Sequence, residues 1–118
     1  MKTILVVDDE IILREYLTEL LELEDYRAIG VSTGNEAMAE IKKQIPDMVI
    51  CDMFLNGETG LDLLRRMRRE GIEKIPFLFM SAEVTPEIRE KAGREGARAF
   101  IKKPYENQLL LETIRTCF

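Results

Sequence analysis

Short apolar runs alternate along this chain with longer segments of helical periodicity. Each run is rich in apolar and β-branched residues and is bounded by charged residues, glycine or proline, which is typical of strands buried on both faces of a sheet. The central run stands out because it ends abruptly in a carboxylate, Asp52. The five predicted strands are Thr3–Val7, Tyr26–Val31, Met48–Asp52, Pro76–Met80 and Ala99–Ile101.

The segments between the strands repeat their apolar residues at the spacing of one helical face. The first predicted helix, Ile11–Leu23, has polar residues opposite this face, so we expect the apolar face to pack on the sheet. Its apolar positions are Ile12, Leu13, Tyr16, Leu17, Leu20 and Leu21. The other predicted helices cover Thr33–Ile45, Leu61–Gly71, Pro86–Gly96 and Leu109–Ile114.

Strand and helix therefore alternate from one end of the chain to the other. Repeated βα units predict an α/β fold, a doubly wound five-stranded parallel sheet covered by helices on both faces. No linker or low-complexity segment interrupts the alternation, so we expect one domain over residues 1–118.

Composition and charge exclude several classes of function. A net charge of −5 disfavours general nucleic-acid binding, which needs a basic surface to release counterions from phosphates. The chain has no histidine, which removes Ser/His and Cys/His catalysis and the usual zinc sites. Its two cysteines suit a reducing compartment, although a disulfide stays open. No segment resembles a signal peptide or membrane span, so we expect a cytoplasmic protein with no membrane or nucleic-acid partner.

Polar side chains gather where the predicted strands end. Asp8 and Asp9 follow the first strand, Asp52 ends the third, Ser81 follows the fourth, and Lys103 follows the fifth. Parallel strands bring these ends to one edge of a sheet, where ligands of open α/β sheets bind. Clustered carboxylates without histidine or cysteine favour Mg²⁺. Together with Lys103, such an ion would admit a phosphoryl group, and Asp52 could then be its acceptor.

Each of these residues also has an ordinary structural interpretation. Asp8 and Asp9 alone suit a turn or a helix cap, Ser81 suits a cap, and Lys103 suits an exposed surface. These interpretations do not explain why the residues all follow different strands. The joint placement therefore favours a functional site.

Four segments together resemble the receiver domain of two-component response regulators, and the resemblance spans the whole chain. It implies a flavodoxin-like (βα)5 fold with strand order 2-1-3-4-5. It also implies a cytoplasmic phosphorelay protein that takes phosphate from a histidine kinase or phosphotransfer protein. The segments are Ile4–Glu10, Val49–Met53, Met80–Ala82 and Phe100–Pro104.

The resemblance assigns metal and phosphate roles to particular residues. Asp52 would be the phosphoacceptor and, with Asp9, a ligand of Mg²⁺. Asp8 would act mainly through water, and the backbone carbonyl of Phe54 would complete the protein ligands. Lys103 would pair with the phosphoryl group, and the peptide bond between Lys103 and Pro104 would be cis.

The resemblance also implies how phosphorylation is transmitted. Ser81 would hydrogen-bond the phosphoryl group, and Phe100 is at the position of the family's switch aromatic. The surface changed would be the fourth helix, fifth strand and fifth helix, acting on a downstream protein target or a fused output domain. Its cations suggest an acidic or helical partner; they are Arg94, Arg98, Lys102 and Arg115.

The chain departs from the family pattern at three places. Asn56 stands where most receivers carry proline, which predicts a more mobile turn without an effect on active atoms. Arg98 and Ala99 replace two aspartates that support dimerisation in DNA-binding regulators, so we expect a monomer. Ser81 replaces the commoner threonine and keeps its hydroxyl.

Two other functions use the same fold. A Mg²⁺-dependent aspartyl-phosphate phosphohydrolase would need an acid two residues after the nucleophile, where this chain has Phe54. A flavin carrier would need a Gly/Ser/Thr phosphate loop after the first strand, where Asp8 and Asp9 would repel phosphate. The phosphohydrolase is the stronger alternative to a non-enzymatic switch.

Overall fold

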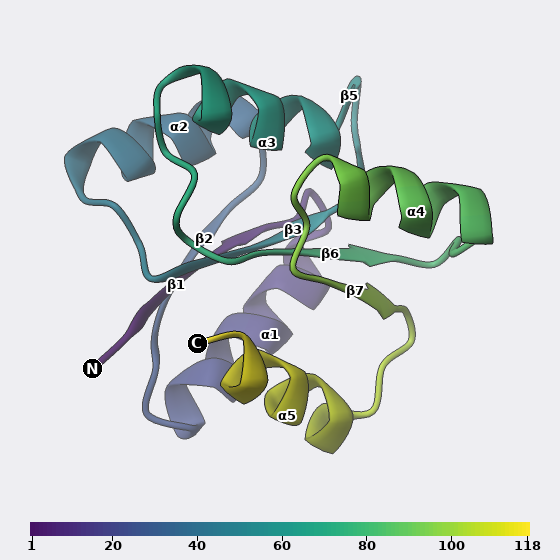
Figure 1. Ribbon diagram of the computed structural model, residues 1–118. Coiled ribbons are helices and arrows are strands. Elements are labelled where there is room, and N and C mark those ends of the chain that lie inside the picture. The colour runs from purple at the N-terminus through teal and green to yellow at the C-terminus, as the bar shows by residue number, and fades with distance from the viewer.

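The computed structural model describes residues 1–118 and has one five-stranded parallel sheet, in the order β2-β1-β3-β6-β7 (Figure 1). The predicted order 2-1-3-4-5 is confirmed, because the fourth and fifth predicted strands are β6 and β7 and an unpredicted hairpin supplies β4 and β5. The sheet strands are β1 (Thr3–Val7), β2 (Arg27–Val31), β3 (Met48–Asp52), β6 (Phe77–Ser81) and β7 (Ala99–Lys102).

Helices cover both faces of the sheet (Figure 1). Leu5, Val49 and Phe79 belong to the larger apolar cluster, which packs against α2, α3 and α4. Ile4 and Ile50 point to the opposite face and pack against α1 and α5. The helices are α1 (Ile11–Leu23), α2 (Gly34–Lys43), α3 (Gly60–Arg69), α4 (Pro86–Arg94) and α5 (Asn107–Cys117). None of them is both long and apolar enough to cross a bilayer.

Threonine caps start three of the helices. The hydroxyls of Thr33, Thr59 and Thr85 each accept a hydrogen bond from a backbone N–H in the first turn of α2, α3 and α4. Asp62 completes a capping box at α3, and Pro86 occupies the first turn of α4, where its missing N–H costs no hydrogen bond.

Two predictions about the helices are wrong in detail. Helix α2 ends at Lys43 rather than Ile45, because Gln44 is extended and Ile45, which precedes proline, is disfavoured in helical conformation. In α1 only Leu17 and Leu21 are buried. The remaining predicted core positions of α1 are exposed or partly exposed, including Ile12 at 78% and Tyr16 at 48%.

The unpredicted element is a small hairpin directly after the central strand. It consists of β4 (Phe54–Leu55) and β5 (Glu58–Thr59), which pair antiparallel. Its two central residues are Asn56 and Gly57, and Gly57 has φ +76°. Such strands are too short to give an alternating sequence pattern, yet this hairpin forms one side of the carboxyl edge of the sheet.

Candidate phosphorylation site

The carboxyl ends of four strands bring the predicted polar residues together. Asp8 directly follows β1, Asp52 ends β3, Ser81 ends β6, and Lys103 directly follows β7. These strands are neighbours in the sheet, and Ser81 is in register with the residue before Lys103. The expected gathering of these side chains at one edge is therefore confirmed.

Lys103 bridges two buried carboxylates. Its Nζ donates hydrogen bonds to Asp52 Oδ2 at 2.8 Å and to Asp8 Oδ2 at 3.1 Å. The side chains of Asp8 and Asp52 are only 2% and 10% exposed. One ammonium thus faces two largely desolvated carboxylates, which leaves negative charge unbalanced at the edge of the sheet.

The local environment perturbs both partners of the shorter ion pair. Burial raises the pKa of the Asp52 carboxyl, and the hydrogen bond from Lys103 only partly opposes this effect. Burial also lowers the pKa of Lys103, but the hydrogen bond and charge of Asp52, with the charge of Asp8, outweigh it and raise the pKa of Lys103 above its ordinary value. The ammonium is therefore kept charged beside a carboxylate that is costly to ionise.

Three carboxylates lie close enough to hold one metal ion. Asp8, Asp9 and Asp52 each offer an oxygen, and these oxygens lie within 4.8 Å of one another. The donors are all hard oxygen atoms with no nitrogen or sulfur among them, a set that fits Mg²⁺. Asp9 Oδ2 also accepts a hydrogen bond from the backbone N–H of Asn56 at 2.8 Å.

An open pocket of about 370 Å³ leads to Asp52. The N–H of Phe54 donates to Asp52 Oδ1 at 3.4 Å, and the Phe54 side chain is 48% exposed beside the pocket. Ser81, which is 1% exposed, accepts a hydrogen bond through its Oγ from the N–H of Glu83 at 3.1 Å. The pocket is lined by Glu10, Asp52, Phe54, Ser81, Ala82, Glu83 and Lys103. A group the size of a phosphoryl can thus reach Asp52 from solvent.

Comparison with known proteins identifies the family of this chain. The family model described as the response regulator receiver domain matches residues 4–115. The chain belongs to the receiver family of response regulators.

Several relatives show how receivers occur within longer proteins. The receiver is 30% identical over 115 residues to the phosphate regulon transcriptional regulatory protein PhoB of Pseudomonas aeruginosa, covering 97% of this chain and 50% of PhoB. It is 34% identical over 113 residues to the sensory/regulatory protein RpfC of Xanthomonas campestris, covering 93% of this chain and 16% of RpfC. The chain thus spans half or less of the length of these relatives.

Solved structures agree with the fold. The chemotaxis protein CheY4 of Vibrio cholerae superimposes with a TM-score of 0.95 at 27% identity, covering 100% of this chain and 99% of CheY4. The non-phosphorylated HemR receiver domain of Leptospira biflexa gives a TM-score of 0.89 at 30% identity, covering 99% of this receiver and 94% of that chain.

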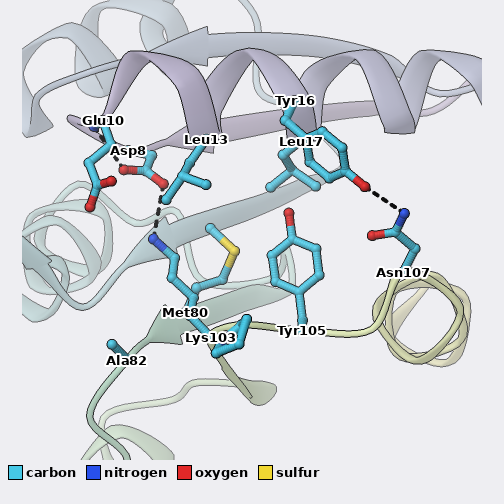
Figure 2. Close-up of a pocket in the computed structure, with 11 residues that line it drawn as sticks. Asp8, Glu10, Leu13, Tyr16, Leu17, Met80, Ala82, Lys103, Tyr105 and Asn107 are labelled. Atoms are coloured by element: carbon cyan, nitrogen blue, oxygen red, sulfur yellow. Dashed lines mark hydrogen bonds and ion pairs between the residues drawn. The ribbon is translucent and has the colours of Figure 1, made fainter.

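A second groove of the receiver, of about 390 Å³, shares Asp8 and Lys103 with the site (Figure 2). It lies between α1 and the segment that leads into α5. Figure 2 shows Tyr16 and Asn107 meeting at its far end, where Asn107 Nδ2 donates to the Tyr16 hydroxyl at 2.7 Å. Its walls are largely apolar and include Leu13, Leu17, Met80 and Tyr105. Two apolar residues of α1 that the sheet leaves exposed, Leu13 and Tyr16, therefore line a groove that shares Asp8 and Lys103 with the site.

The remaining predicted positions are also placed by the fold. The peptide bond between Lys103 and Pro104 is cis, as the resemblance implied. Phe100 is partly buried on β7, with its ring centroid 6.1 Å from that of Phe79 and 5.9 Å from the guanidinium carbon of Arg89. Phe100 thus lies between the core and the exposed side of α4.

Sequence reasoning missed two contacts made by the backbone at this edge. The prediction that Asn56 affects no active atom is wrong, since its N–H contacts Asp9. Arg14 Nη1 donates to the carbonyl oxygen of Asp8 at 2.9 Å and so ties α1 to the end of β1. Backbone groups carry no residue signature, so no motif could have revealed either contact.

Proposed function

We propose that this receiver is a phosphorylation-controlled switch in which Asp52 accepts a phosphoryl group from a histidine kinase or a phosphotransfer protein, with Mg²⁺ as cofactor. The observation that carries the proposal is the position of Asp52. It is the carboxylate at the bottom of the open pocket, with Lys103 Nζ at 2.8 Å and carboxylate oxygens of Asp8 and Asp9 nearby.

The chemistry follows from these groups. An oxygen of Asp52 bonds to phosphorus while the bond from phosphorus to the leaving group breaks, and its electron pair departs with the leaving group. Lys103 offers its ammonium to the phosphoryl oxygens, which compensates the charge brought by the donor. Asp8, Asp9 and Asp52, with the carbonyl of Phe54, would hold Mg²⁺, which supplies the further positive charge that a phosphoryl group needs to approach carboxylates.

Ser81 connects the site to the rest of the receiver. Its hydroxyl lies at the end of β6 and can donate a hydrogen bond to a phosphoryl oxygen on Asp52, a strong acceptor. Movement of Ser81 would open space for the Phe100 ring beside β6 and shift the surface formed by α4, β7 and α5. Such a shift needs only a small difference in free energy between two packings.

This α4–β7–α5 surface is our candidate for the contact with a downstream protein target or a fused output domain. Its exposed cations are Arg94, Arg98, Lys102 and Arg115, while exposed acids on α4 and α5 make its charge mixed. A partner with an acidic or helical binding segment fits this surface. We expect the receiver itself to be monomeric and cytoplasmic.

The groove beside α1 suits the phosphodonor protein. Leu13 and Tyr16 are exposed in this groove, which shares Asp8 and Lys103 with the site, so a donor that docks there brings its phosphoryl group close to the acceptor. Exposed apolar clusters of this kind mark protein-binding surfaces.

Intact-mass measurement after incubation with Mg²⁺ and a small phosphodonor, either acetyl phosphate or phosphoimidazole, tests the assignment. Wild type should gain one phosphoryl group and Asp52→Asn none. Asp25→Asn, which changes an exposed aspartate in the loop before β2, is the matched control and should be labelled like wild type. Undiminished labelling of Asp52→Asn would refute Asp52 as the acceptor.

A further inference from the structure

One acidic side chain lies where the acceptor pocket meets the groove beside α1. Glu10 directly precedes α1 and lines both cavities, together with Ala82 and Lys103. Figure 2 shows its carboxylate at the same end of the groove as Asp8 and Lys103. We propose that Glu10 is a specificity-determining residue, and that its carboxylate selects phosphodonors whose leaving group is an imidazole ring. The inference rests on the proposed function, because it concerns the donor of the same phosphoryl group.

The Glu10 carboxylate is available to a ligand. The side chain is exposed, does not cap α1, and takes part in no hydrogen bond or ion pair of the receiver. The main chain beneath it is fixed, since the N–H of Glu10 donates to Asp8 Oδ1 at 3.0 Å. Lys103, the cation that lines both cavities, is engaged by Asp8 and Asp52. Glu10 therefore offers an unpaired negative charge to a group that enters from the groove.

In-line transfer places the leaving group on the side of the pocket where Glu10 lies. Phosphorus must lie between the attacking oxygen of Asp52 and the departing atom, so the leaving group faces the open side of the pocket. The exposed residues that line the pocket are Glu10, Phe54, Ala82 and Glu83. Of the two acids, only Glu10 also lines the groove in which we expect the donor protein to dock. A ring that arrives from the groove thus comes next to Glu10.

Two small phosphodonors should respond to this carboxylate in opposite ways. Phosphoimidazole reacts with a proton on its distal ring nitrogen: the P–N bond breaks, its electron pair stays on that nitrogen, and neutral imidazole leaves. The distal N–H of the charged ring can donate to the Glu10 carboxylate, which stabilises the reactive form of the donor. Acetyl phosphate instead breaks a P–O bond and releases acetate, whose negative charge Glu10 repels. In both reactions the new bond joins phosphorus to an oxygen of Asp52.

Rate constants for phosphorylation by phosphoimidazole and by acetyl phosphate, each measured at saturating Mg²⁺, test the inference. Glu10→Gln keeps the shape of the side chain and removes its charge. It should slow the reaction with phosphoimidazole about threefold and speed that with acetyl phosphate about threefold, so the ratio of the two constants falls about tenfold, as expected for one exposed charge. Effects on Asp52, on the metal or on folding cancel in this ratio, because both donors share them.

Glu15→Gln is the matched control, because Glu15 is an exposed acid of α1 that lines neither cavity. It changes the net charge equally and should leave the ratio as in wild type. If Glu10 only stabilised the start of α1 through the helix dipole, Glu10→Gln would change the free energy of unfolding and not the ratio.

The outcomes separate the inference from the proposed function. An unaltered or higher ratio in Glu10→Gln, or an equal fall in Glu15→Gln, would overturn the inference, while labelling of Asp52 would still support the proposed function. If neither donor labels Asp52 in wild type, the proposed function is wrong and the inference falls with it.

Discussion

Gly60, the first residue of α3, has no space for a side chain. A Cβ there would lie 2.6 Å from the carbonyl oxygen of Asp52, 2.7 Å from Phe79 Cε1 and 3.1 Å from Cys51 Sγ. The helix cannot simply retreat, because the N–H of Gly60 donates to the carbonyl oxygen of Met53 at 2.7 Å. Gly60→Ala should therefore strain the end of the central strand directly behind the acceptor.

The size of the effect follows from these distances. An ordinary contact begins at 3.4 Å, so the Cβ and the Asp52 oxygen must separate by about 0.8 Å, the difference from 2.6 Å. Strand backbone and an aromatic ring yield poorly, and overpacking of this kind costs roughly 1–3 kcal/mol. The higher helix propensity of alanine recovers less than about 1 kcal/mol. A net loss of about 1–2 kcal/mol corresponds to a fall of roughly 4–8 °C in Tm for a chain of this size.

Gly93→Ala is the matched control. Gly93 lies inside α4, and a Cβ added there would meet nothing within 4 Å, so alanine should stabilise the receiver by about 0.5–1 kcal/mol. Urea unfolding followed by circular dichroism compares the two variants, and phosphorylation of Gly60→Ala should also be slower because Asp52 is displaced. A Gly60→Ala variant as stable as wild type would refute the packing argument, as would equal destabilisation by Gly93→Ala.

Four further predictions concern the site. Burial raises the pKa of Asp52 above 3.8, so the folded state holds a proton that the unfolded chain has lost, and stability falls as pH rises from 3.8 through the raised value. When thermal unfolding is measured at several pH values, Asp52→Asn should not show this fall in stability. A variant whose stability falls with pH as steeply as that of wild type would contradict the prediction. Asp9→Ala should abolish Mg²⁺ binding by titration and phosphorylation by intact mass. Phe54→Asn should change the decay of phosphorylated receiver severalfold, by ~1 kcal/mol of barrier, because Phe54 lies beside the pocket; an unaltered decay would place the attacking water elsewhere. Beryllofluoride with Mg²⁺ should shift the amides around Phe100, and Ser81→Ala should blunt that response.

The local pattern was enough to predict the sheet and much of its functional edge. The five apolar runs became the five strands, since runs this short and this apolar are stable only when both faces are covered. The strand order came from the resemblance to receivers. Asp8, Asp52, Ser81 and Lys103 could be grouped in advance because parallel strands end at a common edge, whatever the details of packing.

The same pattern did not predict which apolar residues of α1 are buried. The apolar spacing in α1 correctly predicts a helix, but it cannot say how much of the apolar face the sheet covers. Leu17 and Leu21 reach the core, whereas Ile12 and Tyr16 remain exposed, because the sheet contacts only a narrow stripe of α1. Periodicity describes one element, and burial depends on its neighbours.

Residue identity and order along the chain thus determined which groups could meet at the carboxyl edge of the sheet. The tertiary structure decided how they meet: Lys103 between Asp8 and Asp52, and the N–H of Asn56 on Asp9. The physical reason is that these contacts join residues far apart in sequence, at distances set by helix packing and by the turn of a short hairpin. A backbone N–H is present at almost every position, so only its direction in the folded receiver makes it specific.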